Sequence, residues 1–160
     1  MGPVRKIVAT ALLGAVGCAS GPGGGAPADA APRFSGSWGV EWCNPSRPDH
    51  ECGGFHVTLV QSGDRVCGDY GGALVNLRQV DEGLIEGIVR ADTAELDVHS
   101  GRNGEIVRAY AKRVGEDLHW EAGETLRAAG SDIIIIATNE VLERREDRPS
   151  SLNGACGGTG

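Results

Sequence analysis

The sequence is short of the residues that mark several common functional classes. Its five cysteines include no C-x-x-C pair, which argues against a zinc or thioredoxin-type site. Phe, Trp and Tyr make up only 4% of the chain, so a core could use all of them. Lysine and arginine number 15 against 22 aspartates and glutamates, for a net charge of −7. This acidic balance argues against nucleic acid as a partner and against adhesion to anionic head groups.

Apolar runs are short as well. The run at 7–16 has ten residues, whereas a helix needs about 20 to span a bilayer. With Arg5 and Lys6 before it, the run has the parts of a secretory signal. Residues 15–18 (AVGC) then resemble the bacterial lipoprotein processing box, although Ala15 stands where that box prefers leucine. The alternatives are ordinary cleavage nearby with plain secretion, or a retained cytosolic N-terminus.

The lipoprotein resemblance implies the organisation of the N-terminal region. Residues 1–17 would be the signal peptide, removed in the mature chain, and Cys18 would carry the lipid. Residues 18–32, rich in Gly, Pro and Ala, would form a flexible linker. The membrane is then a partner through the N-terminal lipid. The location is the cell envelope, at the outer membrane or the periplasmic face if the host is Gram-negative.

Cysteine counting supports this interpretation. Removing Cys18 for acylation leaves Cys43, Cys52, Cys67 and Cys156, an even set as expected for disulfides in an oxidising compartment. Three connectivities are open. We favour Cys43 with Cys52, which closes a short loop, and Cys67 with Cys156, which anchors a Gly-rich tail.

Residues 33–147 form one predicted β domain, and residues 148–160 a Gly-rich tail. Residues 37–42 (SWGVEW) alternate apolar and polar side chains, as a half-buried strand does. Further strands are expected at 55–60, 84–90, 94–100, 106–114, 117–120, 133–136 and 141–145, a one- or two-turn helix at 124–129, and turn signals include 71–72 and 81–83. The pattern predicts an all-β fold with little helix, an antiparallel up-and-down β-barrel of about eight strands, or else a sandwich.

Residues 36–38 (Gly-Ser-Trp) are similar to the G-x-W signature of the lipocalin, avidin and related calycin barrels. In those families a basic residue at the end of the last strand packs across the tryptophan. The resemblance therefore implies that Arg144 or Arg145 closes the barrel over Trp38, which a cation–π contact would favour physically. The domain also resembles small exported bacterial proteins of unknown function at Gly53–Tyr70, Ser100–Gly104 and Leu118–Trp120, a family that brings no activity with it.

The sequence contains few candidate catalytic or metal-binding residues. Asp49, His50 and Glu51 form one cluster between two cysteines, but such loops are more often solvated surface than a metal site. His56 and His119 fall on the strand face opposite the apolar set, so we expect them outside. No nucleophile–base pair or metal set stands out. We therefore expect no enzyme, no metal and no cofactor.

Two function classes remain. The barrel interior could take a small apolar ligand, as lipocalin-like barrels do. Alternatively, the barrel is a rigid platform that binds an envelope protein or a foreign enzyme. The binding element would be the loop at 44–51, which contains Asp49, His50 and Glu51. A cavity among inward-facing small residues would favour the first class, and a filled core the second.

Overall fold

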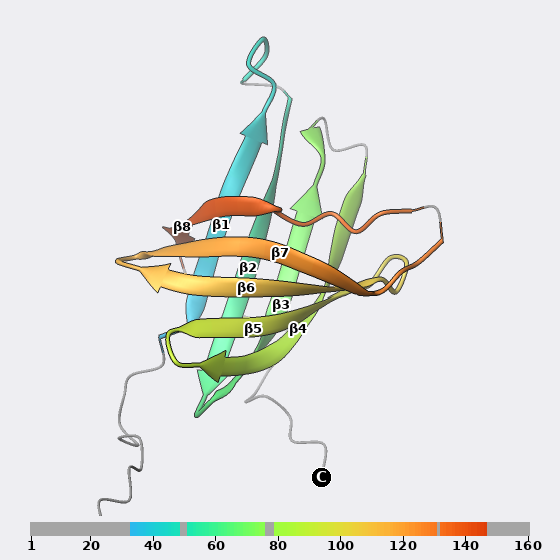
Figure 1. Ribbon diagram of the computed structural model, residues 1–160. Helices are drawn as coiled ribbons and strands as arrows, with labels where there is room; N and C mark the ends of the chain where they lie inside the picture. Colours follow the sequence, from blue (N-terminus) through green and yellow to red (C-terminus); the bar gives the residue numbers. More distant parts are fainter. Residues whose placement is uncertain (1–32, 49–50, 76–78, 131, 147–160) are drawn as a thin grey trace, which may run out of the picture.

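Alternating apolar and polar residues form eight strands in the computed structural model, which describes residues 33–48, 51–75, 79–130 and 132–146 (Figure 1). The strands are β1 (Gly36–Cys43), β2 (Cys52–Ser62), β3 (Arg65–Ala73), β4 (Val80–Arg90), β5 (Thr93–Ser100), β6 (Ile106–Val114), β7 (Asp117–Arg127) and β8 (Asn139–Arg145). Each strand pairs antiparallel with the next, and β8 pairs with β1. The predicted all-β up-and-down barrel is confirmed, and the described residues contain no α-helix.

The register decides which side chains point into the barrel. Trp38 pairs with Val57 on β2 and with Arg144 on β8, so these three residues face inward. Ser37 pairs with Thr58 and with Arg145, and these three face outward. Because side chains alternate along each strand and paired residues point to the same side, the register separates inward-facing from outward-facing residues on all eight strands.

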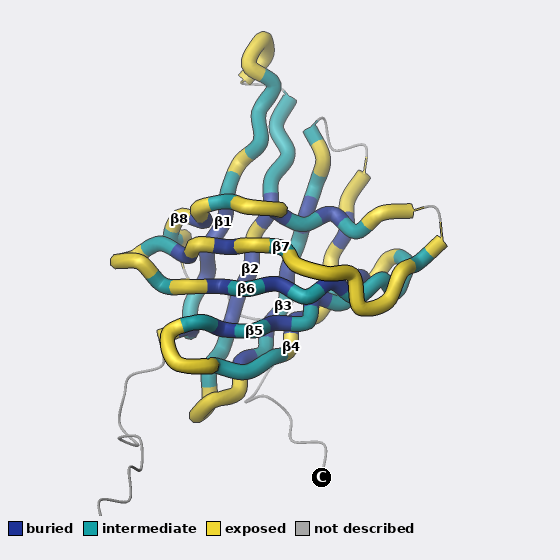
Figure 2. Tube along the Cα trace, viewed as in Figure 1, coloured by how far each residue is buried: buried dark blue, intermediate teal, exposed yellow. Residues whose placement is uncertain are grey.

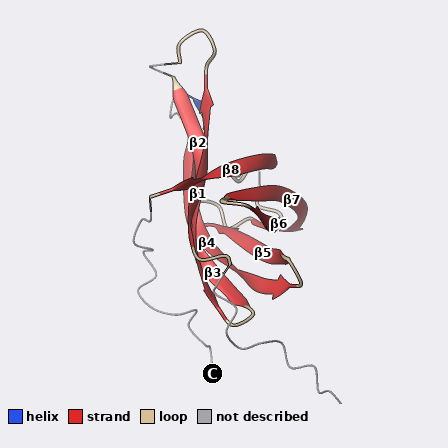
Figure 3. Ribbon diagram, turned by 90° about the vertical axis from the view of Figure 1, so that its left-hand side faces the viewer, coloured by secondary structure: helices blue, strands red, loops and turns tan. Residues whose placement is uncertain are grey.

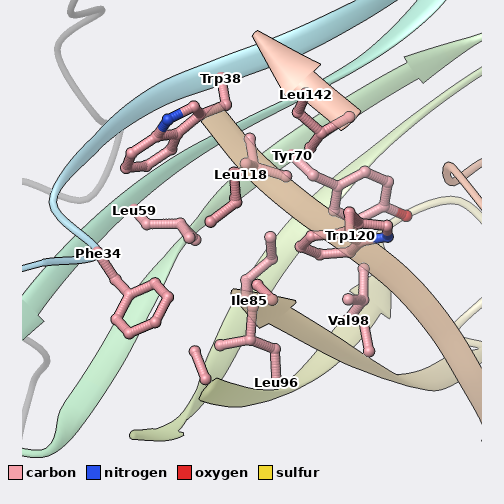
Figure 4. Packing of buried hydrophobic residues seen from close by; sticks show 14 of the residues in the cluster. Phe34, Trp38, Leu59, Tyr70, Ile85, Leu96, Val98, Leu118, Trp120 and Leu142 are labelled. Atoms are coloured by element: carbon pink, nitrogen blue, oxygen red, sulfur yellow. The ribbon is translucent and has the colours of Figure 1, made fainter. Parts of the chain in front are cut away.

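The inward side chains fill the barrel. The largest fully buried ones belong to Trp38, Trp120, Phe34, Phe55, Leu59, Ile85, Leu96, Leu118, Leu142, Val57, Val66 and Val98. The ring centroid of Phe55 lies 5.2 Å from that of Trp120 and 5.9 Å from that of Tyr70. Buried stretches run through the middle of the strands (Figure 2), and the clustered side chains interdigitate in the interior (Figure 4). The core is thus built by the chain itself.

Two sequence-based expectations were wrong. Residues 124–129 are not helical, because β7 continues to Arg127 by pairing with β6 through a register shift at Ile106–Ala109. Strand pairing provides hydrogen bonds to backbone N–H and C=O groups that a helix of one or two turns would leave without partners. Residues 133–136 are not a strand either. They belong to a segment without strand pairing, residues 132–138, which we call the closing segment.

Two of the turn signals were also misplaced. Residues 71–72 lie inside β3, a strand that the sequence analysis did not single out, and residues 81–83 lie inside β4. Gly83 faces inward against Tyr70, and a Cβ there would lie 1.9 Å from the His99 carbonyl oxygen and 3.0 Å from the Tyr70 ring. Glycine at this point marks a close backbone approach within a strand, not a turn.

Replacing Gly83 by Ala should therefore lower the free energy of unfolding by about 2 kcal/mol, because the added methyl overpacks a fixed backbone. Chemical denaturation followed by far-UV circular dichroism measures this change. Gly63 is the matched control, because its added Cβ would meet nothing within 4 Å. Its φ of 63° is tolerated by asparagine, so Gly63→Asn should cost less than Gly83→Ala. Equal losses in both variants would contradict the close-approach explanation.

Candidate functional site

One end of the barrel is closed by Trp38 between two arginines. The guanidinium carbon of Arg144 lies 4.8 Å from the centroid of the Trp38 ring, and that of Arg113 lies 5.2 Å from it. The Trp38 Nε1–H donates a 3.0 Å hydrogen bond to the Glu116 carbonyl. Arg144 also donates from Nη1 to the Ser35 carbonyl at 3.2 Å. We call this arrangement the Trp38 end.

The structure separates the two arginines that the sequence analysis left as alternatives. Arg144 faces the interior and covers Trp38, whereas Arg145 faces outward with its guanidinium 3.9 Å from the Glu41 carboxylate. Arg113 was missed, although a signal existed. It continues the inward-facing series of Val107, Ala109 and Ala111 by two residues.

The Arg144→Ala substitution should lower the free energy of unfolding by about 1–2 kcal/mol, because it removes a partly buried cation–π contact and a hydrogen bond. Arg145→Ala should change that free energy by less than about 0.5 kcal/mol, because its side chain is exposed and its ion pair is solvated. Urea denaturation midpoints compare the two. Unchanged midpoints for Arg144→Ala would remove the support for a closing role.

The other end of the barrel carries a buried polar cluster. The Ser100 hydroxyl lies 2.9 Å from both carboxylate oxygens of Asp81 and donates to them. Asp81 also accepts a 3.3 Å hydrogen bond from the Ile135 N–H. Asp81, Ser100 and Tyr70 all have relative exposures of 5% or less. We call this the Asp81 end.

The closing segment seals this end and is fastened by side chains from several strands and loops. Trp120 donates from Nε1 to the Ala137 carbonyl at 3.0 Å, and Glu105 accepts from the Ile134 N–H at 3.0 Å. Asn103 donates to the Asp132 carbonyl at 3.0 Å, and Arg102 donates to the Ile133 carbonyl. Ile135 and Ala137 are buried as a result. The apolar run at 133–136, which does not alternate with polar residues, thus covers this end of the barrel and contacts the core with apolar side chains.

Tyr70 is the most perturbed group of the Asp81 end. Burial, followed by the negative charge of Asp81, raises the pKa of the Tyr70 hydroxyl far above its ordinary value of 10.0. The hydroxyl is buried and has no hydrogen-bond partner of standard geometry in the described part of the chain. The closing segment covers the cluster, and its Ile135 N–H donates to Asp81. The arrangement of the cluster supports a structural role, because Asp81 joins Ser100 of β5 and the closing segment to β4.

Removal of the Tyr70 hydroxyl should therefore matter only at high pH. At about pH 8, Tyr70→Phe should change the free energy of unfolding by less than about 1 kcal/mol, because the hydroxyl makes no hydrogen bond of standard geometry. Stability from the neutral phenol is complete below its unfolded pKa and is lost as pH rises through the higher folded pKa. Above pH 10 the unmodified chain should thus lose stability faster than Tyr70→Phe. Denaturation series at several alkaline pH values measure this, and parallel losses would contradict the assignment.

The last residues of β1 and the first residues of β2 form a projecting tip, at the end of β1 that is opposite to Gly36 (Figures 1 and 3). Cys43 and Cys52 are joined by a disulfide, as predicted. Within the loop, the Asn44 N–H donates to the Glu51 carbonyl at 2.8 Å, and the Asn44 Nδ2 donates to the Glu51 carboxylate at 2.7 Å. Arg47 forms an ion pair with the same carboxylate. Glu51 is thus a structural member of the loop, whereas Asp49 and His50 lie outside the described residues.

The remaining cysteine predictions are only partly visible. Cys67 is disulfide-bonded and lies on the outward face of β3. Its predicted partner Cys156 lies outside the described residues, as do Cys18 and the whole of 1–32 and 148–160. The pairing of Cys67 with Cys156 and the lipidation of Cys18 stay predictions.

A groove of about 1180 Å³ follows the outward faces of β1–β4. Gly39, Gly54 and Gly71 form much of its floor, and the His56 ring lies so close to Gly71 that a Cβ there would come within 2.4 Å of it. Arg145 borders one side, and the other carries the exposed apolar side chain of Leu84. The sequence analysis missed this groove, although glycines at outward strand positions were its signal.

The three histidines of the described residues lie on three different strands, β2, β5 and β7. His56 and His119 are exposed on the outside of the barrel, as the strand alternation predicts. His99 also faces outward, with its Nε2 3.4 Å from the Glu86 carboxylate. Across the described ranges, no group of three or more His, Cys, Asp or Glu side chains is placed to hold a metal ion.

Comparisons with protein-family models, with curated proteins and with solved structures give no match for this chain. In the described part of the chain, no helix has the length and hydropathy needed to cross a membrane. The calycin resemblance is supported at the level of fold, because the barrel is closed, antiparallel and built of eight strands in sequence order.

Proposed function

We propose that this chain is a non-catalytic envelope lipoprotein, anchored through Cys18, whose barrel presents the β1–β2 tip to another extracytoplasmic protein. The observation that carries the proposal is the construction of the tip. It is cross-linked and hydrogen-bonded within itself, while Pro45, Ser46, Arg47 and Pro48 remain exposed. A loop already held in one conformation has less entropy to lose on binding, which favours affinity.

The direction of β1 supports the same proposal. Gly36, where β1 begins, follows the predicted 18–32 linker by four residues. From there the strand runs to Cys43, a distance of about 23 Å for seven steps of extended chain. The linker would therefore enter the barrel at the Trp38 end, and the tip lies at the other end of β1. A recognition element is most accessible there.

The filled interior favours this proposal over an apolar-ligand carrier. Carriers enclose their ligand in cavities of a few hundred Å³ lined by apolar side chains. Here Phe55, Tyr70 and Trp120 meet in the middle of the barrel, and both ends are covered. Loading a ligand would require these rings to move out of close packing, which well-packed cores resist.

Site-specific photo-cross-linking in the host envelope tests the proposal. A photoreactive phenylalanine analogue is placed at Arg47 on the tip and, as a matched control, at Lys112 on the outward face of β6, since both side chains are more than half exposed. We expect discrete protein adducts from position 47 that are absent from position 112. The captured protein, once purified, should bind the unmodified chain at least tenfold more tightly than the Cys43→Ser/Cys52→Ser variant. Adducts of equal yield at both positions, or equal affinities, would overturn the proposal.

A further inference from the structure

β1 is paired on both sides over only part of its length. Its ladder with β2 includes all eight residues of the strand, whereas its ladder with β8 includes only residues 37–39. Beyond Gly39, no described residue pairs with residues 40–43 on the side of β8. β1 continues past β8 toward the tip in both views (Figures 1 and 3). We call residues 40–43 the open edge.

The pairing of β1 with β2 shows which backbone groups point out of the open edge. The Cα atoms of Cys43 and Cys52 are 4.0 Å apart, the short spacing of an antiparallel pair that exchanges no backbone hydrogen bonds. The next pair agrees, because the Asn44 N–H donates to the Glu51 carbonyl at 2.8 Å. The two kinds of pair alternate along a ladder, so Glu41 and Cys43 direct their N–H and C=O groups away from β2. Two donors and two acceptors thus face the open side.

The open edge is already held in the conformation that a further strand requires. The disulfide at Cys43 fixes its register on β2, and the side chains of Val40 and Trp42 pack against the core. A sheet edge with unpaired N–H and C=O groups is a template for another strand. In such a pairing, main-chain hydrogen bonds give affinity and side chains at alternate positions give specificity.

The side chains along the open edge indicate what kind of strand fits it. Val40 and Trp42 face inward and are only partly buried, so apolar side chains suit this face of an added strand. Glu41 faces outward with its side chain 68% exposed. A basic side chain beside it would form a favourable cross-strand pair.

The charges beside the open edge favour a basic strand over a second copy of this chain. Residues 40–43 of β1 and 139–143 of β8 carry three carboxylates and no basic residue. Arg145, 3.9 Å from Glu41, offsets one of these charges. Antiparallel pairing of two β1 edges would bring the Glu41 side chains of both copies close together, and like charges across strands are destabilising.

We propose that the tip binds its partner by strand addition to the open edge. An extended segment of the partner protein, with apolar and basic side chains in alternation, pairs with the N–H and C=O groups of Glu41 and Cys43. Its apolar side chains lie beside Val40 and Trp42, and a lysine or arginine lies beside Glu41. This inference rests on the proposed function, because it specifies how the tip binds a protein.

Amide hydrogen exchange, measured by NMR on the full chain, tests the open edge itself. In the free protein, the amides of Glu41 and Cys43 should exchange at least tenfold faster than those of Val40 and Trp42, which point toward β2. The probe is an eight-residue peptide of alternating lysine and valine, which at saturation should slow exchange at Glu41 and Cys43 at least tenfold. Equal exchange of all four amides in the free protein, or no protection by the peptide, would overturn the inference.

A peptide of alternating glutamate and valine is the matched control for charge. It should bind at least tenfold more weakly than the lysine–valine peptide. Glu41→Lys should abolish this preference, whereas Glu82→Lys, the same charge change at an exposed position of β4, should leave it within twofold. Equal affinities of the unmodified chain for both peptides, or an unchanged preference in Glu41→Lys, would overturn the inference.

Glu41→Pro tests the hydrogen bonds of the edge. Proline removes the N–H that points away from β2 and is tolerated where the N–H of a strand faces solvent. The protein captured through position 47 should bind Glu41→Pro at least tenfold more weakly than Glu41→Gln, which loses the same charge but keeps the N–H. Equal affinities would overturn strand addition and leave the proposed function intact. Failure of position 47 to capture a protein would overturn the proposed function, and the peptide experiments would then decide the binding mode of the edge.

Discussion

Replacing Trp38 by Ala should lower the free energy of unfolding by about 4 kcal/mol, a typical loss when a buried indole is truncated. Trp38 is fully buried and packs with the cluster that fills the barrel. The variant also leaves the Glu116 carbonyl without its donor and leaves two guanidinium groups facing a cavity in place of a ring. Since domains of this size have free energies of unfolding of about 5–15 kcal/mol, the variant should retain only a small part of its stability.

Urea denaturation followed by far-UV circular dichroism measures the effect independently of tryptophan fluorescence. Trp42→Ala is the matched control, because Trp42 lies four residues further along the same face of β1 but is only partly buried. Its loss should be about half as large or less. Equal losses in the two variants would show that Trp38 has no special part in closing the barrel.

Replacing Asp81 by Ala should lower the free energy of unfolding by about 3 kcal/mol, because two buried donors lose their acceptor. The Ser100 hydroxyl and the Ile135 N–H both donate to this carboxylate. The second of these bonds holds the closing segment, so its loss should also expose the Trp120 side chain to water. A red shift of tryptophan emission before global unfolding is the expected spectroscopic sign.

Glu82→Ala is the control for Asp81, since Glu82 is the next residue of β4 and faces outward into solvent. It should change stability by less than about 0.5 kcal/mol. A double-mutant cycle of Asp81→Ala with Ser100→Ala should give a coupling of at least about 1 kcal/mol between the two side chains. Additive losses would contradict a shared hydrogen-bonded cluster.

The fold was largely predictable because alternation is a local property of the sequence. Residues 37–42 already show which side chains face inward, and the structure places Trp38 in the interior as expected. The disulfide between Cys43 and Cys52 was also predictable, since a hairpin brings residues on either side of a short loop together. These features depend on residues close in sequence or on a single repeating period.

Features that depend on distant partners were not predictable. The helix expected at 124–129 was wrong because pairing with β6 across a register shift prevailed over a weak local preference. Residues 133–136 have the composition of a strand, yet Asp81, Glu105 and Trp120 hold residues 134–137 over the barrel end without a strand ladder. No local pattern in the sequence brings those three side chains to one place.

Native mass spectrometry of the protein, gently extracted from its host's membranes, tests the central claim most directly. The account predicts a denatured mass of residues 18–160 plus acyl groups and less four hydrogens, for a lipid anchor and two disulfides. Under native conditions it predicts a complex with a second protein and no small-molecule adduct. An unlipidated chain, or an adduct of a small apolar molecule in place of a protein, would contradict the account of an anchored barrel that presents its tip.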